Sequence, residues 1–288
     1  MPKSVVVTGA NSGIGLATAV ELAQAGYDVI GTVRSADKAE RLRGAAAERG
    51  VQVRTVELDV ADDASTREGF ARIGRMTTGG PWAVVNNAGA VQPGAVEDVP
   101  LDDARAQLEV NLLAPARIAQ LVLPAMRTRG DGRIVNVSSV AGRVSAPLSG
   151  WYCASKAGLE ALSDALRMEV AQFGVRVVLI EPGGFGTAIW ERSADRWPDR
   201  PGSPYAEVYE RAQTLSEQGR RLPDPVWVAR TIRLALATPR PLPRYLVGVD
   251  AVAATLGDAL TPTPVGDYVK GVSAGLRRLT PRLPRLRG

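Results

Sequence analysis

The sequence predicts an α/β fold built on a doubly wound parallel sheet. Apolar segments typical of strands alternate with helical segments, and a glycine-rich turn joins the first strand to the first helix. Elements that alternate in this way form right-handed βαβ units and a parallel sheet. The chain has 288 residues, 45% of them hydrophobic, so it can bury a sizeable core. One such sheet can use about 250 residues, and we expect a single domain over 1–250 with a basic extension over 251–288.

The elements follow from the chain in order. We expect strands at 3–8, 28–33, 51–58, 82–85, 133–137, 176–180 and 244–248. Helices are expected at about 16–25, 36–49, 62–76, 101–128, from 151 onward and at 225–237. In the long helix, Pro115 has no N–H and leaves the carbonyl of Asn111 free to hold a water. A simple kink is the alternative, and the sequence leaves both open.

The turn after the first strand reads T-G-A-N-S-G-I-G over 8–15. Glycines allow the backbone to approach a pyrophosphate, and a helix N-terminus presents free N–H groups with a partial positive charge. The alternative is a glycine turn without a ligand. Because the turn lies between a strand and a helix, we favour a phosphate site.

A phenol and an ammonium share one helix face further along the chain. Tyr152 and Lys156 are four residues apart, and Ser139 lies at the end of the strand 133–137, where sites form in doubly wound sheets. A nearby cation favours the phenolate, so we expect the pKa of Tyr152 to fall. A solvated helix face would be the ordinary alternative, and the serine and the glycine turn argue against it.

Composition excludes several classes of function. Cys153 is the single cysteine, so no internal disulfide can form, and we expect a reducing, cytoplasmic setting. Histidine is absent, which excludes histidine triads and most zinc sites, and we expect no metal. No apolar run approaches the roughly 18 residues of a membrane span. The net charge of +5 comes from the stretch 265–288, so the body is formally neutral and nucleic acid is not an expected partner.

Six motifs in this order resemble the short-chain dehydrogenase/reductase family: T-G-A-N-S-G-I-G at 8–15, N-N-A-G at 86–89, V-N-L at 110–112, S-S at 138–139, Y-C-A-S-K at 152–156 and P-G-G-F-G-T at 182–187. The resemblance covers about residues 3–250. The segment after 185 and the stretch R-Y-L-V-G-V-D at 244–250 are similar, more weakly, to the steroid- and retinol-dehydrogenase branch. The family resemblance implies a Rossmann fold of seven strands in the order 3-2-1-4-5-6-7, with helices on both faces.

The resemblance also implies roles for individual residues. The catalytic tetrad would be Asn111, Ser139, Tyr152 and Lys156, with Tyr152 as general acid or base. The cofactor would be held by Thr8, Gly9, Asn11, Ser12, Gly13, Ile14, Gly15, Arg34, Ser35, Asp59, Val60, Asn87, Ala88, Gly89, Tyr152, Lys156, Pro182, Gly183 and Thr187. The substrate would contact Ser139, Tyr152, Phe185 and Trp190.

The end of the second strand bears on the choice of coenzyme. The family uses a carboxylate there to bind the adenosine ribose of NAD, whereas this chain has Val33 followed by Arg34. A guanidinium can pair with a 2′-phosphate through its planar fork, so we expect NADP(H) to be preferred. An ordinary surface arginine is the alternative, and Ser12, where some relatives carry a second basic residue, supports it slightly. NAD(H) therefore remains an alternative coenzyme.

The function implied is an NAD(P)(H)-dependent oxidoreductase that interconverts a secondary alcohol and a ketone, or a primary alcohol and an aldehyde. Aromatic residues gather in a segment at about 185–222 that we interpret as a substrate lid: Phe185, Trp190, Trp197, Tyr205 and Tyr209. They favour a bulky apolar substrate, although these side chains could instead pack the lid onto the body. A non-catalytic NADP(H)-sensing regulator is the competing function, but a sensor has no chemical need for the tetrad.

The C-terminal stretch has apolar residues at helical spacing: Val265, Tyr268, Val269, Val272, Leu276 and Leu279. With the arginines beyond them, an amphipathic helix could lie on an anionic membrane or close over the substrate cleft. Packing on its own body or on a second subunit is at least as well supported, and we expect a homo-oligomer. Pro281 and Pro284 should end any helix.

Overall fold

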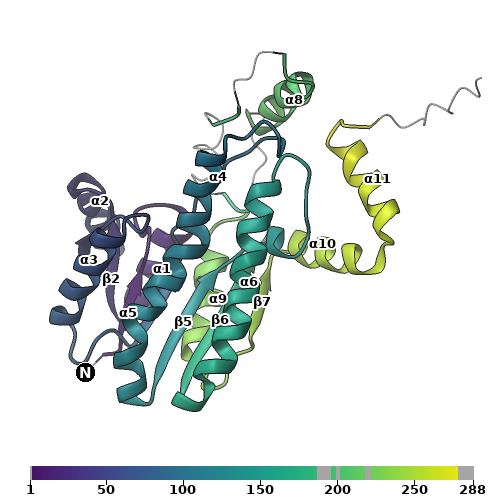
Figure 1. The fold of residues 1–288 in the computed structure, drawn as a ribbon. Helices are drawn as coiled ribbons and strands as arrows, with labels where there is room; N and C mark the ends of the chain where they lie inside the picture. Colours follow the sequence, from purple (N-terminus) through teal and green to yellow (C-terminus); the bar gives the residue numbers. More distant parts are fainter. Residues whose placement is uncertain (1, 187–195, 199–201, 218–221, 278–288) are drawn as a thin grey trace, which may run out of the picture.

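A seven-stranded parallel sheet forms the centre of the molecule (Figure 1). The computed structural model describes residues 2–186, 196–198, 202–217 and 222–277. The strand order is β3-β2-β1-β4-β5-β6-β7, which confirms the predicted fold class and order. The strands are β1 (Ser4–Val7), β2 (Asp28–Val33), β3 (Arg54–Glu57), β4 (Ala83–Asn86), β5 (Gly132–Val137), β6 (Val175–Pro182) and β7 (Arg244–Val247).

Helices cover both faces of this sheet and bury its apolar residues. Three pack on one face: α1 (Gly13–Gln24), α2 (Ala36–Ala47) and α9 (Val226–Ala237). The other face carries α3 (Asp63–Met76), α5 (Ala114–Arg129) and α6 (Gly150–Val170). Because both faces are covered, the central strands read as continuous apolar runs rather than as alternating ones. The third strand is shorter than predicted, since Val51 donates its N–H to the carbonyl of Ala46 and completes the end of α2.

The long helix predicted at 101–128 is divided by a wider turn. Its parts are α4 (Leu101–Leu108), the π-helical turn η1 (Glu109–Leu113) and α5. The N–H of Ala114 bonds to the carbonyl of Glu109, five residues back. Pro115 follows directly and has no N–H to donate. The turn therefore widens around Asn111, and the water on the Asn111 carbonyl stays a prediction.

Two helices extend from the body after the last strand and form what we call the C-terminal arm, residues 249–277 (Figure 1). They are α10 (Val249–Leu260), which the sequence did not predict, and α11 (Thr263–Ser273). The predicted tail helix ends at Ser273, before Leu276, while Leu279, Pro281 and Pro284 lie outside the described residues. Apolar side chains of the arm stay largely exposed, among them Val249, Leu256, Leu260, Val265 and Val269. Within the described ranges, no helix is long and apolar enough to cross a membrane.

Candidate active site

A cleft opens at the carboxyl ends of the strands, around the point where β1 and β4 lie side by side. The chain winds from β1 toward β3 and then returns to β4, and ligands of doubly wound sheets bind at such a reversal. Most of the residues predicted to bind cofactor or substrate line this cleft: Gly9, Asn11, Ser12, Gly13, Ile14, Gly15, Arg34, Asp59, Val60, Asn87, Ala88, Gly89, Ser139, Tyr152, Lys156, Pro182, Gly183 and Phe185.

The glycine turn forms one wall of the cleft. Gly9 and Gly13 have φ of +63° and +52°, which favours glycine. A Cβ on Gly15 would lie 2.3 Å from the carbonyl oxygen of Gly9, so a side chain cannot fit there. The backbone at Gly9 therefore lies against the first turn of α1. The N-terminus of α1 faces the cleft. Free N–H groups at a helix N-terminus together with close backbone approach fit the pyrophosphate of a dinucleotide.

Thr8 lies beneath this wall rather than in it. Its side chain is 1% exposed, and its hydroxyl accepts hydrogen bonds from the N–H groups of Asn87 and Ala88, each at 3.0 Å. The side-chain amide of Asn87 in turn donates to the carbonyl of Thr8 at 2.8 Å. Thr8 therefore joins the ends of β1 and β4, and it shapes the cleft without lining it.

Tyr152 and Ser139 meet in the cleft. Tyr152 is on the first turn of α6, and Ser139 follows β5. Burial raises the pKa of Tyr152 to about 12, although a hydrogen bond from Ser139 lowers it. The predicted fall in the pKa of Tyr152 is therefore wrong. Burial removes water from the phenol, and this raises the pKa more than the hydrogen bond from Ser139 lowers it.

Lys156 is buried one turn further along α6. Its Nζ donates to the carbonyl of Val137 at 2.9 Å and lies 5.8 Å from the centroid of the Tyr152 ring. Burial lowers the pKa of Lys156 to about 8, while the carboxylate of Glu160 raises it. The ammonium is thus held near the phenol by the end of β5.

Asn111 is the fourth predicted catalytic residue, and its side chain forms hydrogen bonds with Ala90 and Ser155. Its Oδ1 accepts from the N–H of Ala90 at 2.9 Å, and its Nδ2 donates to the Ala90 carbonyl and to Ser155 Oγ, both at 2.9 Å. The Ser155 hydroxyl donates to the carbonyl of Tyr152 at 2.7 Å. Asn111 therefore links the loop after β4 to the helix of Tyr152, from a position behind the cleft wall.

The described part of the segment interpreted as a lid is anchored to the body through an acidic pair. The hydroxyls of Ser203 and Tyr209 donate to Asp98 at 2.5 and 2.8 Å, and the hydroxyl of Tyr205 donates to Glu97 at 2.6 Å. Burial raises the pKa of Tyr209 to about 12, and the bond to Asp98 adds to this. The helix α8 (Ala206–Glu217), which the sequence did not predict, begins at this anchor. Tyr205 and Tyr209 thus pack this segment onto the body, which is the alternative that the sequence left open.

The remaining predicted residues fall into two groups. Thr187 and Trp190 lie outside the described residues, while Ser35 begins α2 beside the cleft without lining it. The cleft also contains residues that the predicted set omitted: Thr32, Val33, Leu58, Ala90, Val91, Val110, Val137, Ser138 and Arg196. Val110 and Ser138 belong to the V-N-L and S-S motifs, so the sequence carries a signal for both. Arg196 also lines the cleft, and no local sequence signal marks it.

Comparison with known proteins agrees with this geometry. The model of the short chain dehydrogenase family matches residues 3–197. The uncharacterized oxidoreductase YusZ of Bacillus subtilis is 37% identical over 257 residues, covering 85% of this chain and 89% of that protein. Human retinol dehydrogenase 16 is 36% identical over 282 residues, covering 93% of this chain and 87% of that protein.

The fold of this chain is also similar to those of solved structures. A short-chain dehydrogenase from Streptomyces avermitilis has a TM-score of 0.78 and 34% identity, covering 96% of this chain and 98% of that chain. A variant of actinorhodin polyketide ketoreductase, solved with NADPH, has a TM-score of 0.74 and 26% identity, covering 88% of this chain and 97% of that one.

The fold and the cleft define an oxidoreductase that works with a nicotinamide dinucleotide. The chain belongs to the short-chain dehydrogenase/reductase family. Members of this family use NADP or NAD, so dependence on NAD(P) follows from membership.

Proposed function

We propose that this protein is an NADP(H)-dependent oxidoreductase that interconverts an alcohol and a ketone or aldehyde, with Tyr152 as general acid and base. The observation that carries the proposal is the meeting of Tyr152, Ser139 and Lys156 in the same cleft that the glycine turn lines. A regulator that only sensed the dinucleotide would have no chemical use for this cluster. When bound, NADP(H) would supply or accept the hydride.

The protein's own residues would move the proton. Ser139 orients the carbonyl oxygen of the substrate, and the Tyr152 hydroxyl donates a proton to that oxygen during reduction. Because burial raises the pKa of Tyr152, its phenol stays protonated at neutral pH, which suits a general acid. Lys156 would hold the nicotinamide ribose and would supply positive charge beside the phenol as its proton leaves. Asn111 fixes the first turn of α6 through Ser155 and offers its backbone carbonyl to a relay water.

Arg34 would select NADP(H) over NAD(H). Its side chain is exposed at the rim of the cleft, directly after β2, and Val33 at the end of that strand offers no acceptor for a ribose hydroxyl. A charge-assisted hydrogen bond contributes about 1.5–3 kcal/mol, which corresponds to a preference of roughly 10- to 150-fold. Arg34→Ala should remove most of it, and Val33→Asp combined with Arg34→Ala should reverse it. Equal kcat/KM with both coenzymes in the wild type would contradict this role.

The substrate is proposed to be bulky and apolar. Phe185 lines the cleft beside Pro182 and Gly183, and one relative is named as a retinol dehydrogenase. Tyr205 and Tyr209 support this proposal less than their residue types suggest, because both are engaged with the acidic pair. Steroid, retinoid and polycyclic ketones should be reduced in preference to small sugars. A clear preference for sugars would remove the proposal.

The reaction itself is tested by Tyr152→Phe. The variant should bind NADPH as the wild type does and lose turnover by about 10²–10⁴-fold, the usual contribution of a general acid. Tyr245→Phe is a matched control, because it removes a phenol whose hydroxyl accepts from the N–H of Leu242, away from the cleft. Similar kcat for Tyr152→Phe and Tyr245→Phe would refute the mechanism. Binding of coenzyme without turnover of any carbonyl by the wild type would favour the sensing function instead.

The C-terminal arm is proposed as a contact surface. Its exposed apolar side chains, among them Val249 at 88% and Leu260 at 83%, are not buried on the body. Basic residues beyond them add positive charge, which suits anionic lipid. Co-sedimentation with anionic vesicles at physiological salt should therefore be observed. If it is absent and the protein sediments as an oligomer, the arm serves subunit association.

A further inference from the structure

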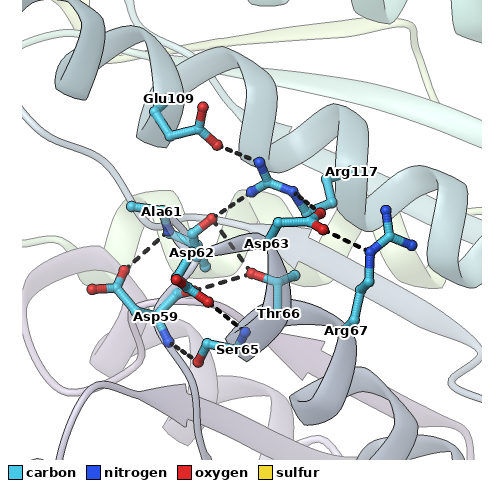
Figure 2. A network of polar contacts seen from close by, with 10 residues as sticks. Asp59, Ala61, Asp62, Asp63, Ser65, Thr66, Arg67, Glu109 and Arg117 are labelled. Carbon is cyan, nitrogen blue, oxygen red and sulfur yellow. Dashed lines mark hydrogen bonds and ion pairs between the residues drawn. The ribbon is translucent and has the colours of Figure 1, made fainter.

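Arg117 lies on α5, outside the cleft, yet its guanidinium contacts three other segments (Figure 2). Its Nη1 donates to the carbonyl of Val60 at 2.9 Å, and its Nε pairs with the Asp63 carboxylate at 2.8 Å. Its Nη2 donates to the carboxylate of Glu109. The Arg117 side chain is only 15% exposed, so these contacts are shielded from much of the solvent.

Two of these contacts lead to segments that line the cleft. Val60, with Asp59 beside it, forms the loop after β3 and lines the cleft. Glu109 begins the π-helical turn η1, in which Val110 also lines the cleft and Asn111 comes next. One guanidinium therefore joins the loop proposed to flank the adenine to the turn that carries a proposed catalytic residue.

The loop side of this connection is itself bound to the start of α3. The N–H of Asp59 donates to Ser65 Oγ at 3.0 Å, and the hydroxyl of Thr66 donates to the Asp59 carbonyl at 3.1 Å. Asp62 caps α3 by accepting from the N–H of Ser65 at 2.6 Å. Figure 2 shows these bonds gathered on the first turn of α3. The loop and α3 thus form one unit, and Arg117 connects that unit to η1.

The π-helical turn η1 depends more on the contact with Arg117 than the loop does. A π-helical turn is a rare conformation that usually occurs as a single turn at a functional site. Its first residue, Glu109, is only 25% exposed and is held by the guanidinium. A planar fork can donate in three directions at once, whereas the ammonium of lysine is a compact point charge on a flexible stem. Arginine is therefore suited to this place, and lysine could satisfy only part of it.

We infer that Arg117 is a positioning residue that sets the spacing between the Asp59–Val60 loop and the Asn111 turn. Coenzyme binding at the loop and the geometry of Asn111 are then coupled through one side chain. The role rests on the proposed function, because it assumes that a dinucleotide occupies the cleft and that Asn111 takes part in the reaction.

The test compares Arg117→Met with Arg67→Met. Arg67 pairs with the same Asp63 at 2.8 Å and does not line the cleft, so it controls for the loss of an ion pair on α3. Backbone hydrogen exchange is measured on the ligand-free proteins, and the Kd for NADP⁺ is measured by titration. In Arg117→Met, amides at 112–114 should exchange at least about tenfold faster, and the Kd should rise about 3- to 30-fold. Arg67→Met should leave both within about twofold.

Glu109→Gln separates the two ends of the connection and serves if Arg117→Met does not fold. It should speed exchange at 112–114 and lower kcat about 3- to 30-fold, with the Kd for NADP⁺ within about twofold of the wild type. Arg117→Lys should recover part of the exchange protection. Exchange at 112–114 that is unchanged in both Arg117→Met and Glu109→Gln, or equally fast in Arg67→Met, would overturn the inference. Failure of the wild type to bind NADP⁺ would instead remove the proposed function, while the exchange result would still report on Arg117.

Discussion

Replacing Glu181 with glutamine should remove a large pH dependence from the stability of the fold. Glu181 lies on β6, and its side chain is fully buried. Arg244 and Arg143 approach its carboxylate at 3.2 and 3.6 Å. Burial raises the pKa of Glu181 from 4.5 to about 7, and the neighbouring Glu160 raises it further, while the two arginines oppose the rise. The folded protein thus favours the neutral acid, although the unfolded chain ionises near pH 4.5.

The sign and size of the effect follow from this difference. A group whose pKa is raised on folding contributes its stability fully below the unfolded pKa and loses it as the pH rises through the folded value. For Glu181 the loss falls between about pH 4.5 and pH 7. At about 1.4 kcal/mol for each pKa unit, the free energy of unfolding should fall by about 3 kcal/mol over that range because of this one group. Glutamine keeps the shape and cannot ionise.

The assay is urea unfolding of the wild type and Glu181→Gln at several pH values from about 4.5 to 8. The difference in unfolding free energy should shift by about 3 kcal/mol in favour of the variant as the pH rises. Glu169→Gln, an exposed change on α6, should show almost no shift. A difference for Glu181→Gln that stays constant to within about 1 kcal/mol across the range would refute the reasoning.

The site leads to three further predictions. Because burial raises the pKa of Tyr152 to about 12, carbonyl reduction should keep its rate up to about pH 7 and fall above it as Lys156, with a pKa of about 8, loses its charge. Alcohol oxidation should rise with pH, and a tenfold loss of reduction between about pH 6 and 7 would contradict this. Gly15→Ala would place a Cβ 2.3 Å from the Gly9 carbonyl oxygen, so the Kd for NADP⁺ should rise more than about tenfold, whereas Gly44→Ala, with open space around it, should stabilise α2 slightly. Asp98→Ala should raise the KM for substrate severalfold and leave the Kd for NADP⁺ unchanged, because Asp98 anchors the lid and not the coenzyme walls; an unchanged KM would argue against an anchored lid.

The sheet and most of the cleft could be predicted from sequence because their signals are local. Apolar runs mark strands that are buried on both faces, and the residues directly after those runs necessarily meet at one edge of a parallel sheet. Arg34, Asp59 and Asn87 each follow a strand in this way, and each lies in the cleft. Their positions needed no knowledge of side-chain packing.

The features that sequence missed depend on contacts between distant segments. The pKa of Tyr152 rises because its phenol is buried. The four-residue spacing of Tyr152 and Lys156 predicts a shared helix face, but it does not predict how deeply that face is buried. An aromatic residue such as Tyr209 could contact an apolar substrate. Its hydroxyl instead donates a hydrogen bond to Asp98, which lies 111 residues earlier in the chain. The π-helical turn at Asn111 has the same apolar spacing as an ordinary helix. In each case the tertiary neighbour decides the outcome.

Arg244 has a consequence for how the protein is made. It donates to Glu160 at 3.1 Å and pairs with Asp164 and Glu181, so it neutralises carboxylates on α6 and β6. These acids leave the ribosome well before Arg244, which is 84 residues after Glu160. Until then they face burial without their main positive partner, which is unfavourable. We therefore expect the nascent chain to complete the cleft only when the last strand emerges, and a ribosome-bound chain that ends before Arg244 should not retain coenzyme.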